Sequence, residues 1–274
     1  MPAEGDPAPG GGRAIVQYWH AAQPPERICR GFDSFREHNP DLTHVVFDET
    51  AAEAFIAENL SAREAAAFRA CAVPAMQSDF FRYCAVYALG GLYADADMCC
   101  VADLRPLIDA EEGTLFGRAE PLPRFDEAIA LPYVVGPYLA VGNSPFAFRE
   151  PRHPLLELAI EVATANIEKR IADGAPGVWL ATGPGIFTSM YLLDRLGSID
   201  AFIDYTAGSG LDPSARLFCE IAGSHDRVAA ALSGVAIQPR EKESEAWMRY
   251  LGDPVPGEPV TPHWTGLTEG IFRA

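Results

Sequence analysis

Apolar residues recur along the chain with two periods that alternate in its first half. Short runs of β-branched and aromatic residues predict strands, and apolar residues spaced three and four apart predict amphipathic helices. The predicted strands cover residues 14–19, 43–47, 92–94, 98–101, 114–117, 128–135 and 138–141. The predicted helices cover residues 24–38, 49–60, 62–71, 76–89, 154–171 and 183–196. This order predicts an α/β fold in which helices flank a sheet that contains parallel strands.

No internal repeat and no linker divides the sequence. We therefore expect one domain over residues 13–274, preceded by a flexible Pro/Gly-rich tail at residues 1–12. The last 70 or so residues mix short apolar runs with Gly and Pro, and this pattern favours a loop-rich C-terminal region.

The chain is strongly acidic, with 21 Lys and Arg against 38 Asp and Glu and a formal net charge of −17. Because hydrophobic residues make up 49% of it, the acidity does not indicate disorder. A nucleic-acid binder needs a basic surface, so that class is excluded as a partner. No apolar run reaches the roughly 18 residues of a membrane span, so no stable membrane insertion is expected.

The six cysteines form no CxxC pair, and Cys99 and Cys100 are adjacent. This pattern suits neither a zinc site nor an ordinary disulfide, and it favours reduced thiols. The first residues carry neither a basic segment nor an apolar segment of the kind that directs secretion. Together these features predict a cytoplasmic protein.

Two acids, Asp95 and Asp97, directly follow the predicted strand 92–94. Alternate residues of an extended strand face the same way, so both carboxylates are expected to converge on one point. Mg²⁺ and Mn²⁺ are hard cations that take oxygen ligands, and either would bridge the acids to a diphosphate. An isolated Asp-x-Asp is equally typical of a solvated turn. The residues around it must therefore show whether this pair has a function.

Those surroundings carry a longer motif. Residues 78–83 read Ser-Asp-Phe-Phe-Arg-Tyr, and residues 90–97 read Gly-Gly-Leu-Tyr-Ala-Asp-Ala-Asp. This resembles the Ser-Asp-x-x-Arg-Tyr … Gly-Gly-x-Tyr-x-Asp-x-Asp signature of glycosyltransferases with a DXD motif. The resemblance is to glycosyltransferase family 32, and the clostridial glucosylating toxins share this donor-site segment.

Weaker similarity to the same family is scattered over residues 14–265. The matching segments are 16–19, 39–41, 45–48, Asn143, 153–154, 182–184 and 263–264. The chain departs from the family pattern at three places: Val16 replaces its usual His, Phe47 replaces its usual Trp, and Trp264 is not followed by its usual ending.

The resemblance implies a GT-A-like single domain with a Rossmann-like mixed sheet. It also implies a hexosyltransferase that moves a sugar from a UDP- or GDP-sugar to an acceptor hydroxyl with retention of configuration. The acceptor is a sugar, a peptide or a small molecule. No residue suggests itself as a general base, so the leaving phosphate is expected to take the acceptor proton.

The resemblance also implies roles for particular residues. Asp79, Arg82 and Asp97 are the expected catalytic residues, with Arg82 on the donor sugar or diphosphate. The expected donor-binding residues are Trp19, Asp79, Arg82, Tyr93, Asp95 and Asn143. The expected ligands of the Mn²⁺ or Mg²⁺ cofactor are Asp95, Asp97 and His263.

The acids Asp79, Asp95 and Asp97 together with Arg82 sum to −3 + 1 = −2. A divalent cation cancels this charge, so we expect donor binding to depend on the metal.

Three alternative functions fit the sequence less well. A dehalogenase-type Asp-x-Asp phosphatase needs an N-terminal strand and a following Thr, and a nucleotidyltransferase needs its Gly-rich loop after the first strand. A non-catalytic nucleotide-sugar-binding module would not need all four charged residues.

Overall fold

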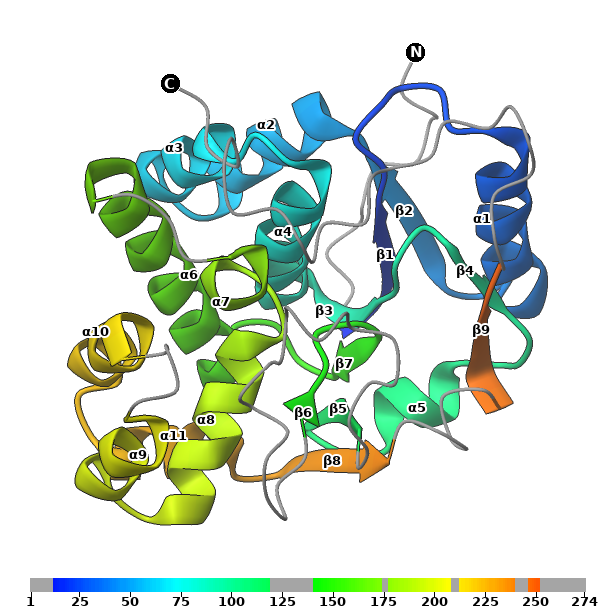
Figure 1. Cartoon of the computed structure of the whole chain (residues 1–274). Helices are drawn as coiled ribbons and strands as arrows, with labels where there is room; N and C mark the ends of the chain where they lie inside the picture. Colours follow the sequence, from blue (N-terminus) through cyan, green and yellow to red (C-terminus); the bar gives the residue numbers. More distant parts are fainter. Residues whose placement is uncertain (1–11, 119–139, 174–176, 208–211, 240–245, 252–274) are drawn as a thin grey trace.

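The structure is a computed structural model that describes residues 12–118, 140–173, 177–207, 212–239 and 246–251 (Figure 1). The predicted strand 128–135, the first residues of the strand 138–141 and His263 lie outside these residues. So does the predicted tail, except that Gly12 already begins the first strand.

The described elements are eleven helices and nine strands. The helices are α1 (Glu26–His38), α2 (Glu49–Asn59), α3 (Ala62–Ala70), α4 (Pro74–Leu89), α5 (Arg105–Asp109), α6 (Pro154–Asp173), α7 (Val178–Ala181), α8 (Gly185–Leu196), α9 (Ile199–Thr206), α10 (Asp212–Ala222) and α11 (His225–Leu232). The strands are β1 (Gly12–Tyr18), β2 (Thr43–Phe47), β3 (Gly90–Tyr93), β4 (Met98–Cys100), β5 (Gly113–Arg118), β6 (Ala140–Val141), β7 (Phe146–Phe148), β8 (Val235–Pro239) and β9 (Met248–Tyr250).

Seven strands form one mixed sheet in the order β2-β1-β3-β7-β5-β6, with β8 paired to β5. The strands β2, β1 and β3 are parallel, β7 is antiparallel to β3 and β5, and β8 is parallel to β5. This mixed sheet flanked by helices confirms the predicted fold class. The predicted strand at 98–101 is not in it: β4 pairs with β9 in a separate two-stranded sheet.

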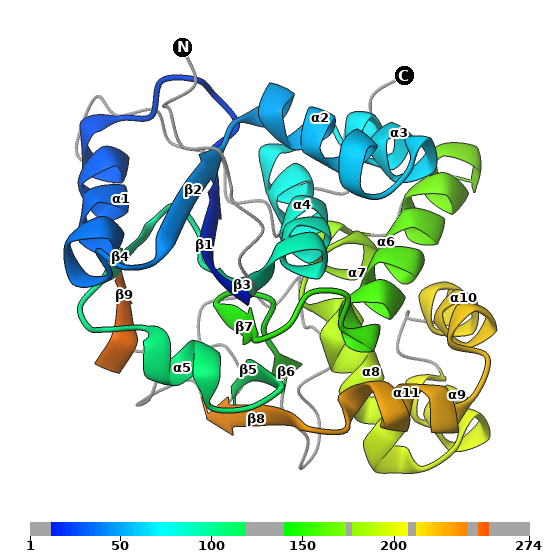
Figure 2. The same ribbon diagram turned by 180° about the vertical axis from the view of Figure 1, so that it is seen from behind.

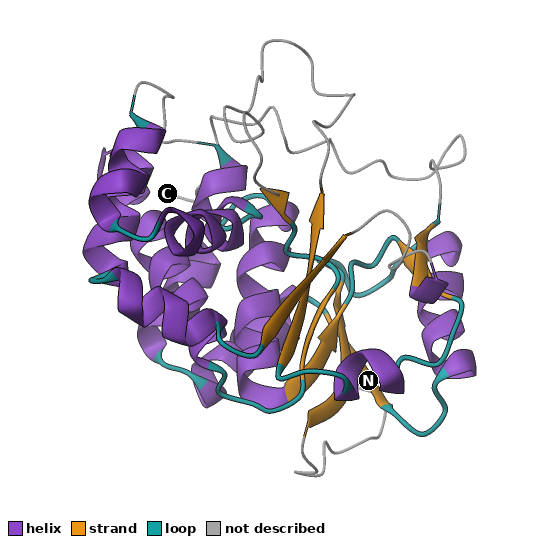
Figure 3. Cartoon of the chain, turned by 90° about the horizontal axis from the view of Figure 1, so that it is seen from below, coloured by secondary structure: helices purple, strands orange, loops and turns teal. Residues whose placement is uncertain are grey.

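Helices cover both faces of the main sheet, as Figures 1 and 2 show from opposite sides and Figure 3 from below. Successive strand residues point to opposite faces. Val16 and Tyr93 therefore enter the larger core with α2 to α4, α6 and the helices that follow, whereas Ile15 and Leu92 enter a smaller core that includes residues of α1 and α5. Two apolar layers thus hold β1 and β3 in the middle of the molecule.

Three helices follow α8 within the described residues: α9 leads into the region expected to be loop-rich, and α10 and α11 lie inside it. Each buries an apolar stripe, represented by Phe202, Phe218 and Val228, in the larger core. The local signal was present: Ser198 and Ser224 accept hydrogen bonds from the backbone of the helices α9 and α11 that they cap. The short elements β7, α5 and α7 were also not predicted.

The junction of α4 and β3 has no loop. The helix ends at Leu89, and Gly90 and Gly91 both have positive φ and already belong to β3. At Gly91 a Cβ atom would overlap the carbonyl oxygen of Ala14 in β1 and lie 2.7 Å from its nitrogen. The chain therefore passes from helix to sheet in one step, and Asp95 follows β3 by two residues.

Among the helices of the described residues, none has the length and apolar character needed to cross a bilayer.

We predict that Gly91→Ala costs about 3 kcal/mol or more of unfolding free energy, because a left-handed φ of +87° is combined with overlap against β1. The matched control is Gly223→Ala, which has a φ of +73° and no atom within 4 Å of the added Cβ. It should lose about 1 kcal/mol. Urea denaturation measures both, and equal losses would show that the close approach of β1 and β3 is unimportant.

Candidate functional site

The predicted pair on α4, Asp79 and Arg82, lies inside the protein. The residues are three apart on the helix and so share a face. Arg82 Nη2 lies 2.9 Å from Asp79 Oδ1, and each side chain is only 5% exposed. An ion pair with this little solvent is screened far less than a surface pair.

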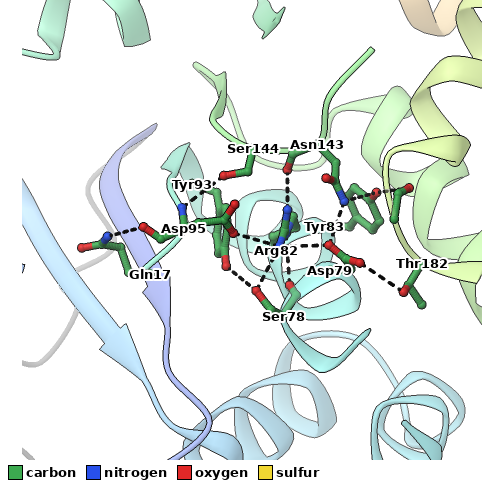
Figure 4. A network of polar contacts seen from close by, with 11 residues as sticks. Gln17, Ser78, Asp79, Arg82, Tyr83, Tyr93, Asp95, Asn143, Ser144 and Thr182 are labelled. Atoms are coloured by element: carbon green, nitrogen blue, oxygen red, sulfur yellow. Dashed lines mark hydrogen bonds and ion pairs between the residues drawn. The ribbon is translucent and has the colours of Figure 1, made fainter. Parts of the chain in front are cut away.

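Arg82 connects α4 to two other segments (Figure 4). Its Nη2 also lies 2.9 Å from Oδ1 of Asp95, the first acid of the Asp-x-Asp motif. Its Nη1 donates to the carbonyl of Asn143 at 3.0 Å, and its Nε donates to the carbonyl of Ser78. The ring of Tyr93 lies beneath the guanidinium, 4.7 Å from Cζ to ring centroid. Both Nη atoms and Nε of Arg82 therefore have protein partners.

Asn143 and Thr182 complete the surroundings of Asp79. Asn143 Nδ2 donates to Asp79 Oδ1 at 3.0 Å and to the hydroxyl of Tyr83 at 3.1 Å. Thr182 Oγ1 donates to Asp79 Oδ2 at 3.4 Å, and Tyr83 donates to the carbonyl of Gly183. The turn at Thr182, one of the segments that resemble the family, thus reaches the same cluster as the predicted donor-binding residues.

Burial dominates the electrostatics of this cluster. It raises the pKa of Asp79 to about 6, even though Arg82 and Asn143 favour the carboxylate. Burial alone would lower the pKa of Arg82, but Asp95 and Asp79 together raise it above its ordinary value. Only the pKa shift of Asp79 departs from that of an exposed ion pair, because burial outweighs the attraction of Arg82. Arg82 therefore stays charged, and Asp79 is ionised at neutral pH.

Asp95 and Asp97 lie in a turn between β3 and β4, closed by a hydrogen bond from Met98 N to Asp95 O. The expectation that they share one side of an extended strand is therefore wrong. The backbone at Asp95 is fixed on both sides, since its N–H donates to Ser144 Oγ and its carbonyl accepts from Gln17 Nε2, both at 3.1 Å.

The turn directs the two acids differently. The Asp95 side chain is 29% exposed and leans on Arg82, whereas Asp97 is exposed. Protein atoms nevertheless surround the carboxyl group of Asp97 closely. This crowding and the charge of Asp95 raise the pKa of Asp97 to about 6, against the attraction of Arg27. The carbonyl of Asp97 accepts a hydrogen bond from Leu251 N at 2.8 Å, directly after β9.

The donor set fits a cation that arrives with a phosphate ligand. Asp95 and Asp97 offer carboxylate oxygens, one of which already pairs with Arg82. In the described part of the chain, no group of three or more His, Cys, Asp or Glu residues is arranged to hold a metal. Mg²⁺ commonly uses one or two carboxylates and completes its shell with water and substrate phosphates. The third predicted ligand, His263, lies outside the described residues.

The two predicted aromatic residues differ in position. Trp19 follows β1 and is half-buried against Ile28, Phe32 and Ala96, and its indole N–H has no partner within the described residues. Tyr93 is fully buried, and its hydroxyl is hydrogen-bonded to Ser78 Oγ at 2.7 Å. In this structure Tyr93 supports Arg82 and presents no surface to a ligand.

A polar relay that the sequence did not predict reaches the acidic turn from β2. His44 Nε2 lies 2.8 Å from Oε1 of Gln17, whose amide group in turn donates to Asp95 O. Gln17 is fully buried, and His44 Nδ1 is buried with no partner in the described part of the chain. A neutral imidazole that donates from Nε2 fits these contacts. The sequence feature that could have indicated this relay is Gln17, a single polar residue inside the otherwise apolar predicted strand 14–19.

Residues 25–114 match the family model for the "Glycosyltransferase sugar-binding region containing DXD motif". This stretch contains Asp79, Arg82, Asp95 and Asp97. The chain carries a glycosyltransferase-like DXD sugar-binding region. The match confirms the resemblance to glycosyltransferases with a DXD motif.

A solved structure titled "PaToxG Glycosyltransferase" is remotely similar to this chain. It is 15% identical, with a TM-score of 0.47, over 80% of this chain and 87% of that one. A comparison with curated protein sequences gives no match.

We predict that Arg82→Met costs about 3–5 kcal/mol of unfolding free energy at pH 7, because it strands the buried charge of Asp79 beside Asp95. The matched control is Arg63→Met, which removes an ion pair with Glu168. In this pair the side chain of Arg63 is 54% exposed and that of Glu168 is 48% exposed. The control should cost about 1 kcal/mol or less. Chemical denaturation measures both, and a similar small cost for each would contradict a buried, shared cation.

We also predict an acid-sensitive contribution from His44. Burial, aided by Arg36, lowers the pKa of His44 to about 3, below its ordinary value of 6.5. Its stabilising contribution is therefore fully present above pH 6.5 and is lost as the pH falls toward 3. From pH 7 to pH 5 the native chain should lose about 2 kcal/mol more than His44→Gln does. The difference between the two proteins isolates His44 from the acids, and identical pH profiles would contradict a histidine that stays neutral in the folded chain.

Proposed function

We propose that this protein is a metal-dependent glycosyltransferase that transfers a hexose from a UDP- or GDP-sugar to an acceptor hydroxyl with retention of configuration. The observation that carries the proposal is the double ion pair of Arg82 with Asp79 and Asp95. It joins both halves of the DXD signature at one point, inside the region that matches the sugar-binding family model.

Asp95 and Asp97 are the proposed ligands of Mn²⁺ or Mg²⁺, together with His263. When bound, the cation would neutralise charge that develops on the departing diphosphate. The formal sum of −2 at Asp79, Arg82, Asp95 and Asp97 opposes a diphosphate on its own. The acidity of the site therefore supports metal-dependent donor binding.

Arg82 is proposed to act from below the donor. Its N–H groups already donate hydrogen bonds to protein atoms. Its proposed role is therefore to orient Asp95 and to place a positive charge next to the diphosphate. Asp79 is proposed to accept hydrogen bonds from sugar or ribose hydroxyls, because each carboxylate oxygen can accept a second bond. Asn143 orients Asp79 for this role.

Trp19 is proposed to stack on the nucleotide base, since aromatic faces stack well and the side chain is only half-buried. Tyr93 is proposed to serve the donor indirectly, by holding Ser78 and Arg82. We propose that the residues of the site hold the acceptor hydroxyl close to the donor sugar. The leaving phosphate would then take the proton of the acceptor hydroxyl.

The proposed setting is the cytoplasm, with a sugar, a peptide or a small molecule as the acceptor. All six cysteines are free, which suits a reducing compartment.

We predict that one UDP- or GDP-sugar from a panel raises the melting temperature in the presence of Mn²⁺, and does so far less with a chelator present. Asp97→Asn should remove most of the shift and lower donor turnover about 100-fold, because it removes a charged metal ligand beside the diphosphate. The matched control is Asp226→Asn on α11, whose side chain is fully exposed and which should behave as the native protein.

The assay separates the competing functions. Binding without hydrolysis or transfer would favour a non-catalytic nucleotide-sugar-binding module. If no nucleotide sugar shifts the protein and Asp97→Asn matches the native chain, the proposal fails.

A further inference from the structure

The helix α1 packs unusually close to the acidic turn. A Cβ atom at Gly31 would lie 2.9 Å from the carbonyl oxygen of Met98 and 3.6 Å from that of Ala96. Only glycine allows this approach without displacement of the turn. Ile28 and Phe32, which precede and follow Gly31 on α1, form a buried apolar cluster with Ala96 of the turn.

This contact brings the first turns of α1, which carry Arg27, toward the acidic turn. Arg27 precedes Gly31 by four residues, so it lies one turn earlier on the same face of α1. The side chain is half-buried. Its positive charge opposes the upward pKa shift of Asp97. Packing and electrostatics thus agree that a second cation borders the acidic turn.

The site needs such a cation. A nucleoside diphosphate carries more negative charge than one divalent ion cancels once the acids of the site are counted. Arg82 is 5% exposed and its donors bond Ser78, Asp79, Asp95 and Asn143. It has little capacity left to contact a phosphate directly, whereas Arg27 retains exposure to solvent.

Building on the proposed function, we propose that Arg27 is a further donor-binding residue, which attracts Asp97 before the donor arrives and binds a phosphate oxygen of the nucleoside diphosphate afterwards. The forked guanidinium suits a phosphate group. The chain has only 21 Lys and Arg against 38 acids, so a cation at this place is not explained by a generally basic surface.

The proposal makes two opposite demands on one side chain. A cation beside Asp97 repels Mn²⁺ and attracts the diphosphate. Loss of the Arg27 charge should therefore tighten the binding of Mn²⁺ alone and weaken the binding of the nucleotide. A residue that only supports the fold of the turn would weaken both when it is replaced.

Isothermal titration calorimetry on the full chain tests these demands, first with Mn²⁺ alone and then with UDP and with GDP at saturating Mn²⁺. Arg27→Gln should bind Mn²⁺ about 3- to 10-fold more tightly and the preferred nucleotide about 10-fold more weakly. Arg27→Lys should restore part of the nucleotide affinity. The matched control Arg30→Gln lies on the same helix but pairs with Glu26 in solvent, and both of its affinities should be unchanged.

The outcomes separate this inference from the function on which it rests. If the native chain binds neither UDP nor GDP, the proposed function fails. If it binds one of them and Arg27→Gln binds that nucleotide equally well, or loses affinity for both Mn²⁺ and nucleotide, the role of Arg27 is overturned while the proposed function stands. Melting curves of each variant confirm that it is folded before titration.

Discussion

The structure depends on one buried cation that two carboxylates share. Removing ions from water costs several kcal/mol each, and only well-placed partners offset that cost. Arg82 is therefore tolerated inside the protein because Asp79, Asp95 and the carbonyl of Asn143 are all in position. Each of these groups comes from a different segment, so α4, the turn after β3 and the segment before β7 must fold together for the charge to be accommodated.

The remainder of the fold supplies the precision that this arrangement needs. Gly91 lets β3 lie against β1 immediately after α4, and Gln17 on β1 then reaches the carbonyl of Asp95. On the other side, Gly31 lets α1 approach the same turn. Two glycine contacts thus hold the acidic turn between a strand and a helix, with Asp97 facing solvent. Such fixed placement suits the binding of a metal and a diphosphate that we propose for this site.

The sequence predicted the parts of this structure that depend on local periodicity. The strand 43–47 and the helices near 49–60, 62–71 and 154–171 were found with boundaries close to those observed, because their apolar residues follow one clear period. The signature also assigns Asp79, Arg82 and Asp95 to one site, and the structure brings their side chains together. The short strand β7 and the helices α9 to α11 were not predicted, because their apolar patterns are too short to show a clear period. Their apolar residues are buried by parts of the chain that are distant in the sequence.

Long-range hydrogen bonds were beyond sequence reasoning. Nothing local shows that Thr182, Ser144 and His44 belong to the polar network of the candidate site, since each reaches that network across the fold. The turn at Asp95 was mistaken for extended strand because alternation in Asp-x-Asp looks the same in both. Its closure depends on Met98, Ser144 and Gln17 acting together.

A double-mutant cycle on unfolding free energy tests most directly whether Arg82 is the shared centre of the site. Asp79→Asn and Asp95→Asn each leave Arg82 with one carboxylate, whereas the double variant leaves a buried cation with none. The account predicts that the double variant loses at least about 1 kcal/mol more than the sum of the single losses. Additive losses would contradict it, because they would mean that the two acids do not share the charge of Arg82.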